Sequence, residues 1–407
     1  MRRTRWIVLG GCFLAYLFDA LEIVLLSMGL PAIRKDMGLT ITQGGLLATA
    51  TLVGIGVSSV LGGYIADNFG RKKALLASLA TFGLFTAAIA VVPSFEVFLL
   101  LRFLAGIGLG AVWSVVSAYV VETWPEKHRG RAAAFVISAF PAGGAMAATI
   151  SGWFLPDWRL MFLVAGAAVV LPIAIVAIFF TESATWAAQK AAEVVSVRDV
   201  LGSSLRRRTL LGTLMAALAL FGYWGAMTWL PTYLTTERGL DKGSVALFVT
   251  IVNLGMFAGY NGFGYLADHI GRHRTIVITL FGVAATLPIY AITTDLTALL
   301  WLGPLFGAFT AFFGLFGSYL GELFPTRARA TGAGFCFNVG RGVSALAPFI
   351  LAGLAASIGF QGGLIVCAGF FALAAVVALL LPRTGAVTET VAAQTVSDPR
   401  DGAPATV

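Results

Sequence analysis

The sequence predicts an all-α membrane protein in which twelve transmembrane helices form two pseudo-symmetric six-helix bundles. Three observations predict this fold: the apolar composition, the recurrence of long apolar stretches, and an internal repeat. Of the 407 residues, 58% are apolar and only 11% are charged, and the mean hydropathy is +0.90. A chain of this composition cannot hide its apolar surface in a water-soluble globule, so it belongs in lipid.

Long apolar stretches follow one another along nearly the whole chain. A helix needs roughly 20 apolar residues to cross a hydrocarbon layer of about 30 Å. The first stretch follows three arginines, as a signal peptide would, but it is too long and contains Asp19 and Glu22, so we expect an uncleaved helix. The expected spans are 6–33, 42–66, 74–92, 97–121, 132–154, 159–180, 210–234, 244–267, 275–293, 297–321, 330–356 and 361–382.

The distribution of basic residues predicts the topology. If the N-terminus is cytoplasmic, 20 of the 27 Lys and Arg residues lie on cytoplasmic segments, 5 on outer segments and 2 within spans. Loops on the cytoplasmic side of a membrane protein typically carry such an excess of Lys and Arg. We therefore expect a multi-pass protein of the plasma membrane, the inner membrane if bacterial, with both termini cytoplasmic. The net charge of +8 then reflects orientation in the bilayer, and we expect no nucleic-acid partner.

The two halves of the sequence repeat each other at a nearly constant offset. Gly63–Arg71 (GYIADNFGR) recurs 201 residues later as Gly264–Arg272 (GYLADHIGR), and Glu122–Pro125 (ETWP) recurs 200 residues later as Glu322–Pro325 (ELFP). Such a parallel repeat predicts two equivalent bundles. The expected units are an N-terminal bundle (1–180), a cytoplasmic linker (181–209), a C-terminal bundle (210–382) and a disordered cytoplasmic tail (383–407).

The repeated motif resembles the signature of the major facilitator superfamily. Gly-x-x-x-Asp-x-x-Gly-Arg lies between the second and third spans and again between the eighth and ninth, and the resemblance covers residues 6–382. It implies a monomeric transporter that works by alternating access. In parallel-repeat transporters of this kind, the substrate binds near the middle of the membrane between the halves.

Shorter motifs resemble one branch of that superfamily, which carries aromatic acids and monocarboxylates such as lactate and sialate together with protons. Asp19-Ala-Leu-Glu22 is similar to the acidic element in the first helix of that branch, and Gly340-Arg341-Gly342 with Pro348 is similar to its Gly-Arg-x-Gly element. The resemblance implies proton-coupled symport of a small organic anion.

Four ionisable residues lie well inside the expected spans: Asp19, Glu22, Arg102 and Arg341. A charge at the bilayer centre costs roughly 2.5 to 3.5 kcal/mol, so such residues usually face the protein interior and serve a transport pathway. By resemblance to proton-coupled porters, Glu22 and Arg102 are the proton-coupling pair, with Asp19 as partner or substitute. The alternative is a static ion pair that tethers two helices.

Arg341 is the candidate for holding the substrate's carboxylate. The spans of the C-terminal half contain no acidic residue for it to neutralise, and its planar fork matches a carboxylate in two hydrogen bonds. Asn338, one turn earlier, is expected to assist. The alternative is an ion pair with Asp19 across the two halves, which would make Arg341 part of a gate.

Aromatic and amide side chains in the spans are further candidates for lining the cavity. Tyr16, Tyr223 and Asn253 are the ones that we include in the predicted substrate site. The alternative for the tyrosines is ordinary packing, and for Asn253 a hydrogen bond that holds helices together.

Charged residues at the cytoplasmic ends of the spans form a predicted gate. By resemblance, ion pairs among them are made when the cavity faces outward and broken when it faces inward. The alternative is that the basic members only orient the protein. The predicted gate residues are Asp67, Arg71, Glu122, Arg129, Asp268, Arg272, Glu322 and Arg329.

Other functions have less support in the sequence. The three cysteines, Cys12, Cys336 and Cys367, lie in spans without metal spacing, and no nucleophile or cofactor constellation is present, so we expect no enzyme, no metal and no cofactor. Two alternatives stay open: proton antiport that exports drugs or metabolites, and sugar or polyol symport. The expected partners are a small organic acid, protons and the lipid bilayer.

Overall fold

The computed structural model describes residues 2–124, 126–182, 200–203, 205–325 and 328–382, and within these ranges every regular element is a helix. The predicted tail (383–407) and most of the predicted linker (181–209) lie outside the described residues. The helices of the first half are α1 (Arg2–Met37), α2 (Ile41–Phe69), α3 (Arg71–Ala88) with the short 3-10 helix η1 (Ile89–Val91), α4 (Phe95–Thr123), α5 (Glu126–Ile137), α6 (Ala139–Phe154), α7 (Trp158–Ala168) and α8 (Val170–Phe179).

The second half repeats this order with different interruptions. Its helices are α11 (Arg206–Thr236), α12 (Lys242–Ile270), α13 (Arg272–Ile292), α14 (Leu296–Phe309), α15 (Phe312–Glu322), α16 (Arg329–Ser344) and α17 (Ala347–Leu379). Several crossings consist of two consecutive helices, such as α5 with α6 and α14 with α15.

Eleven continuous helical stretches in the described residues are long and apolar enough to cross a membrane. The last of them, Thr331–Leu379, has 49 residues and holds two crossings, because Gly359 interrupts it with a φ of 73°. Glycine adopts this backbone region without steric cost. The Glu237 carboxylate accepts hydrogen bonds from the backbone N–H groups of Phe360 (2.5 Å) and Gln361 (2.8 Å). These N–H groups begin the helix after Gly359 and have no partner within it. The twelve predicted crossings are therefore present.

Helix ends are fixed by local signals that differ between the two ends of the molecule. Gly70 and Gly271 make the turns of the repeated motif, with φ of 105° and 92°. At the other end, short polar side chains cap the following helices: the side chains of Ser94, Asp157, Asp241 and Asp295 accept from the N–H three residues later, and Thr40 forms a capping box with Gln43.

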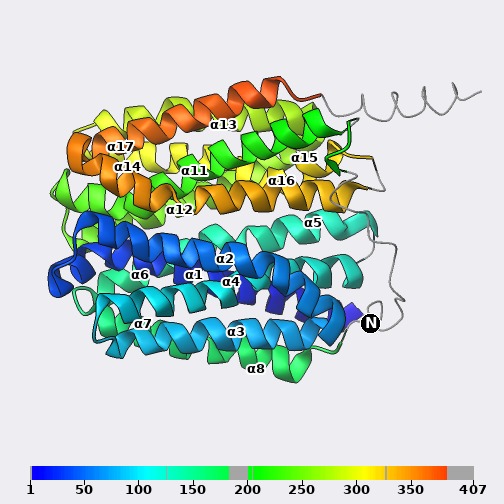
Figure 1. The fold of residues 1–407 in the computed structure, drawn as a ribbon, viewed down its shortest axis with the longest axis horizontal. Helices are drawn as coiled ribbons and strands as arrows, with labels where there is room; N and C mark the ends of the chain where they lie inside the picture. The colour runs from blue at the N-terminus through cyan, green and yellow to red at the C-terminus, as the bar shows by residue number, and fades with distance from the viewer. Residues whose placement is uncertain (1, 125, 183–199, 204, 326–327, 383–407) are drawn as a thin grey trace, which may run out of the picture.

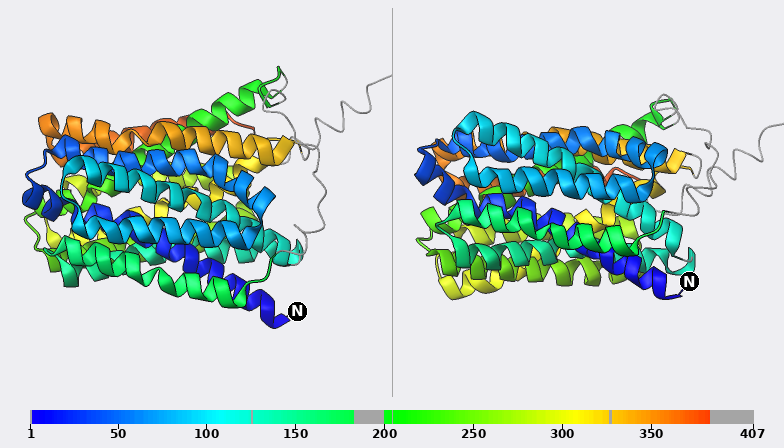
Figure 2. Two further views of the ribbon diagram at one scale, coloured as in Figure 1. Left: turned by 60° about the horizontal axis from the view of Figure 1, so that its bottom comes forward. Right: turned by 90° about the horizontal axis from the view of Figure 1, so that it is seen from below.

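The two halves lie side by side, with their helices along the long axis of the molecule (Figures 1 and 2). The N-terminus lies at the same end as the glycine turns, and we call this the N-terminal end. The opposite end, with the five capped helix starts, is called the far end. The interface between the halves is built mainly by α1, α2 and α6 of the first half with α11, α12 and α17 of the second.

Candidate functional site

Glu22 and Arg102 form an ion pair inside the first half. Glu22 Oε1 lies 2.5 Å from Arg102 Nη1, and the two side chains are 2% and 0% exposed. Arg102 Nε also donates to Thr51 Oγ1 at 2.9 Å, and the Thr51 hydroxyl donates to the Leu47 carbonyl at 3.1 Å. The pair thus joins α1, α2 and α4 within one bundle.

Asp19 lies one turn before Glu22 on α1 but in a different environment. Its side chain is only 4% exposed, yet it makes no hydrogen bond or ion pair with any described residue, and its Oδ1 atom has no partner. It interacts electrostatically with Arg341 of the second half and with Glu22. The two acidic residues predicted to share a role are therefore held differently.

Arg341 lies near the end of α16 and is half-buried. Its guanidinium makes no hydrogen bond, and no ion pair within 4.0 Å, with any described residue, although it interacts electrostatically with Tyr16 and Asp19. The Asp19–Arg341 ion pair that the sequence left open is thus not formed in this conformation. Asn338, one turn earlier, is also half-buried, and its side chain makes no hydrogen bond within the described chain.

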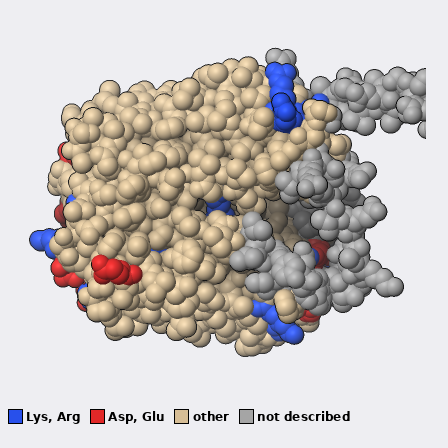
Figure 3. Space-filling model, viewed as in Figure 1, with Lys and Arg blue, Asp and Glu red and all other residues tan. Residues whose placement is uncertain are grey.

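The outer surface between the two ends of the molecule is mostly uncharged on the face shown in Figure 3, as a lipid-facing belt should be. In the view of Figure 3, charged side chains gather toward the two ends of the molecule. One exception is a hollow between the halves, near the middle of this face, where Lys or Arg atoms are visible at the bottom. Positive charge is therefore reachable from outside at mid-height.

Aromatic rings from both halves meet next to these charges. Tyr16 of α1 lies 5.9 Å from Phe140 of α6, measured between ring centroids, and Phe140 stacks on Phe313 of α15 at 5.6 Å. Tyr223 of α11 lies 5.3 Å from both Trp224 and Phe313. These separations are typical of packed aromatic pairs. The predicted residues Tyr16 and Tyr223 are thus joined by one cluster that crosses the interface.

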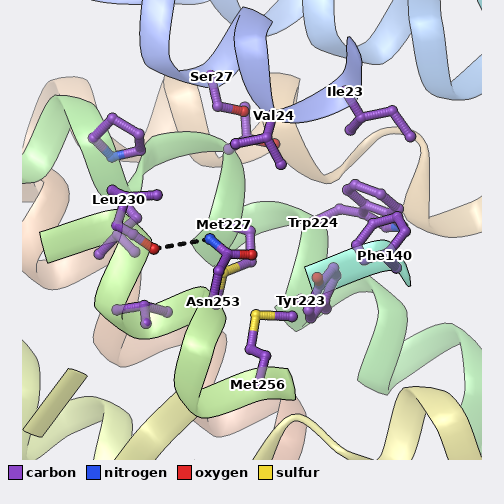
Figure 4. A pocket seen from close by; sticks show the side chains of 14 residues that line it. Ile23, Val24, Ser27, Phe140, Tyr223, Trp224, Met227, Leu230, Asn253 and Met256 are labelled. Carbon is purple, nitrogen blue, oxygen red and sulfur yellow. Dashed lines mark hydrogen bonds between the residues drawn. The ribbon is translucent and has the colours of Figure 1, made fainter. Parts of the chain in front are cut away.

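A mainly apolar cavity lies beside this cluster (Figure 4). Its walls come from α1, α6, α11 and α12, with Ile23, Val24 and Ser27 on one side and Met227, Asn253 and Met256 on another. Asn253 Nδ2 donates to the Val249 carbonyl at 2.9 Å, so this amide group is engaged with its own helix. Tyr223 and Asn253 therefore both line the cavity, but Asn253 is partly satisfied without a ligand.

Four of the eight predicted gate residues form ion pairs within their own half. Arg71 Nη2 lies 3.1 Å from Glu122 Oε1, and the repeat-related Arg272 pairs with Glu322. Asp268 and Arg329 are exposed. Asp67 and Arg129 belong to α2 and α5, but their side chains lie outside the described residues. Neither of these two ion pairs crosses from one half to the other.

Contacts between the halves instead gather toward the far end. Thr149 Oγ1 and Thr250 Oγ1 are 3.3 Å apart, and Lys242 Nζ donates to the Leu155 carbonyl. Gly45 of α2 packs so closely that a Cβ atom there would lie 2.7 Å from the Pro348 carbonyl oxygen. Within the described chain, every hydrogen bond between the halves lies toward this end, so the halves are joined there.

Comparison with known proteins identifies the family. The sequence model of the Major Facilitator Superfamily matches residues 12–348, with a second match over 234–401. The chain belongs to the major facilitator superfamily. Its relatives include a putative metabolite transport protein of Haemophilus influenzae, 31% identical over 88% of this chain and 90% of that one, and the cis,cis-muconate transport protein of Acinetobacter baylyi, 30% identical over 91% and 92%.

A solved structure supports the same fold. A bacterial homologue of the human lysosomal transporter Spinster, in an inward-facing and unoccupied conformation, matches with a TM-score of 0.74 at 16% identity over 93% of this chain and 97% of that one. The family match and the relatives make this chain a transporter and not an enzyme, and its resemblance to the aromatic-acid branch of the superfamily is confirmed.

Sequence reasoning did not assign two residues that stand out in this transporter. Trp224 Nε1 is buried near the aromatic cluster and has no hydrogen-bond partner among the described residues, and the buried Tyr260 hydroxyl lies close to the hydroxyl groups of Tyr223 and Thr310. Both residue types are common packing residues in a chain with 9 Trp and 9 Tyr, so nothing in the sequence distinguishes them. The missing signal is the hydrogen-bond environment of each side chain, which only the packed structure reveals.

Proposed function

We propose that this transporter carries a small organic anion, an aromatic acid or other monocarboxylate, together with a proton. The observation that carries the proposal is the free Arg341 guanidinium beside the unpaired Asp19 carboxylate at the interface. Arg341 holds the substrate's carboxylate through its two-pronged donor fork. Asn338 and the rings of Tyr16 and Tyr223 complete the site.

Charge balance gives the reason for coupling to a proton. In the empty site the charges of Glu22 and Arg102 cancel each other, and those of Asp19 and Arg341 cancel as well. An arriving carboxylate adds one negative charge to a region shielded from water, where an uncompensated charge is costly. Protonation of Asp19 restores neutrality, so anion and proton bind best together. The loaded carrier is then neutral, and a pH difference of one unit supplies about 1.4 kcal/mol per transported molecule.

The proposal gives the two acidic residues of α1 different duties. Asp19 carries the proton, because its carboxylate has no partner and faces the charge of the other half. Glu22 and Arg102 hold α1 against α2 and α4, because their hydrogen bonds stay within one half and survive any movement of the halves. The alternative coupling site is Glu22 itself, with Arg102 moving away from it.

The same proposal sets the orientation in the membrane. The basic N-terminal end is cytoplasmic, in a plasma membrane, following the positive-inside rule. The far end is then the outer gate, closed here by contacts such as Thr149 with Thr250. The cytoplasmic ion pairs Arg71–Glu122 and Arg272–Glu322 brace each half as it rocks.

Transport into proteoliposomes tests the proposal. A thermal-shift screen of the purified protein against a panel of carboxylates, including benzoate and lactate, first identifies the acid that binds. That acid is then used in the transport assay. We expect the wild type to accumulate that acid when the outside is made acidic, and Arg341→Lys to bind it at least about 10-fold more weakly, because lysine cannot make the bidentate contact. Accumulation only when the inside is acidic would instead establish proton antiport, and unchanged affinity in Arg341→Lys would remove Arg341 from the site.

A further inference from the structure

Five basic residues of the described chain lie at the far end, and one of them differs from the other four. Arg159, Arg238 and Lys242 each donate to backbone carbonyls. Lys35 is exposed to solvent. Arg34 is half-buried, its Nε atom is fully buried, and its guanidinium makes no hydrogen bond or ion pair with any described residue. A cation withdrawn from water without a partner is costly, so this arrangement needs an explanation.

The acidic side chains around the end of α1 are engaged elsewhere and do not neutralise Arg34. Asp36 accepts from Trp158 Nε1 at 3.2 Å and lies 3.8 Å from Arg159 Nη2. Two residues rotate a helix by about 200°, so Asp36 and Arg34 lie on opposite sides of α1. The Glu237 carboxylate accepts from two backbone N–H groups of α17. Three further acidic residues at this end cap helix starts: Asp157, Asp241 and Asp295.

Arg34 lies on the side of α1 that lines the cavity of Figure 4. Ile23 and Ser27 are both part of the cavity wall. At about 100° per residue, Arg34 lies within about 20° of each of them around the helix axis. At about 1.5 Å per residue, it lies about 10 Å beyond Ser27 and about 22 Å beyond Asp19. One side of α1 therefore leads from Arg34 past the cavity toward Asp19.

Arg34 also lies at the seam that closes the far end. A Cβ atom placed on Gly44 of α2 would lie 3.0 Å from Arg34 Cδ and 3.4 Å from Trp229 Cη2. Trp229 belongs to α11 of the second half, and its Nε1 atom donates to the Pro348 carbonyl at 2.9 Å. Arg34 and Trp229 thus meet at one point from opposite halves. When the halves separate at the far end, Trp229 moves away and the guanidinium faces the opened passage.

We propose that Arg34 is an entry site for the substrate anion. In the far-end-open conformation its guanidinium binds the incoming carboxylate transiently and releases it along α1 toward Arg341 and Asp19. The inference rests on the proposed function, because it takes a carboxylate as the substrate. Since Arg34 has no acidic partner, no ion pair has to be broken before the anion binds. An anionic lipid headgroup offers the same charge, and lipid composition distinguishes the two.

Binding kinetics test the entry site, because a transit site changes the rates of entry and exit but not the final affinity. Gly45→Leu supplies the background, since leucine there occupies the space of the Pro348 carbonyl and keeps the far end open. The probe is the acid of the panel, benzoate or lactate among them, that binds the wild type most tightly. Stopped-flow fluorescence of the full-length protein in phosphatidylcholine nanodiscs measures the rate constants, over the range in which the observed rate rises linearly with acid concentration.

We expect Arg34→Gln, added to Gly45→Leu, to lower the association and dissociation rate constants together by about 5-fold. The Kd should stay within about 2-fold, which also shows that the variant is folded. Lys35→Gln is the matched control, because it removes the same charge from the neighbouring exposed residue, and it should change neither rate constant by more than about 1.5-fold. Raising KCl from about 20 to about 500 mM shortens the screening length from about 20 Å to about 4 Å and should remove most of the Arg34 effect.

The outcomes separate the entry site from the proposed function. An unchanged association rate constant in Arg34→Gln, or an equal fall in Lys35→Gln, would overturn the entry site while carboxylate transport stands. A faster dissociation with lost affinity would place Arg34 in the final binding site and contradict transit. An effect that appears only when the nanodiscs contain phosphatidylglycerol would assign Arg34 to lipid headgroups. If no acid of the panel binds the wild type, the proposed function fails and the entry site fails with it.

Discussion

Two regions of the molecule each contain one acidic and one basic side chain: Glu22 with Arg102 inside the first half, and Asp19 with Arg341 at the interface between the halves. Only Glu22 and Arg102 are bonded to each other. Arg102 is also bonded to Thr51, and all of these residues belong to one half. Asp19 and Arg341 come from opposite halves, and their side chains make no hydrogen bond or ion pair with any described residue. The bonded pair holds helices of one bundle together, although Arg102 Nη2 has no partner among the described residues. Under the proposed function, the unbonded charges at the interface are available for a ligand and a proton.

The largest difference between the two regions should appear in stability. Arg102→Met leaves the buried Glu22 carboxylate without its partner, and breaking a buried pair in this way typically costs 3 to 5 kcal/mol. We expect a large drop in thermal unfolding temperature in detergent, partly restored when Glu22→Gln is added. Arg341→Met breaks no bond in this conformation and should lower the unfolding temperature much less. Equal falls in unfolding temperature in Arg102→Met and Arg341→Met would contradict the difference between the two regions.

Much of this fold could be predicted from the sequence, because hydropathy and repeated motifs are local properties. The twelve crossings follow from apolar length, and the turns at Gly70 and Gly271 follow from a motif in which only glycine fits a positive φ. The spacing of Asp19 and Glu22 also predicts that both lie on one face of α1.

The division of roles between those two acids could not be predicted. Three residues correspond to about 300° of helix rotation, so Asp19 and Glu22 point only about 60° apart. Which of them faces the other half depends on how α1 is rotated against its neighbours, and that is decided by packing over the whole bundle. The unpaired states of Trp224 Nε1 and of the Arg34 guanidinium were unpredictable for the same reason, since a missing partner is a property of the assembled interface.

A second difference should appear in the pH dependence of substrate binding. If a proton binds to Asp19 together with the acid, the affinity of the wild type should rise about 10-fold for each unit by which the pH falls, over the range in which the empty site is deprotonated. Asp19→Asn mimics the protonated form and should bind with an affinity nearly independent of pH. Glu22→Gln should keep the wild-type slope.

Isothermal titration of the acid over a pH range that extends well above neutrality measures these slopes. The range must stay above the pH at which the acid itself becomes protonated in solution, and a buffer series with different ionisation enthalpies counts the protons taken up. A flat profile in Glu22→Gln with a normal slope in Asp19→Asn would reverse the assignment and return the proton to Glu22.

The smallest expected effect concerns the closure of the far end, which involves the interface between the halves but not the Glu22–Arg102 pair. A Cβ atom at Gly45 would lie 2.7 Å from the Pro348 carbonyl oxygen and 2.9 Å from the Ala352 Cβ atom, so Gly45→Ala should disfavour closure of the far end by about 1 kcal/mol. Gly56, on the same helix, has no atom within 4 Å of the equivalent position and supplies the control, Gly56→Ala.

Cysteine labelling can follow this shift because the three native cysteines are buried. Ser27 lines the cavity from α1 and is buried in the far-end-closed conformation, so Ser27→Cys should react slowly with a membrane-impermeant maleimide added at the far end. Adding Gly45→Ala should raise that rate several-fold, and adding Gly56→Ala should not.

Because Glu22 and Arg102 belong to one half, the pair should be unaffected by Gly45→Ala. The unfolding temperature should therefore still fall by the full amount when Arg102→Met is combined with Gly45→Ala. A smaller fall in the unfolding temperature would mean that the stability of the Glu22–Arg102 pair depends on which end is closed. The pair and the interface would then be energetically coupled.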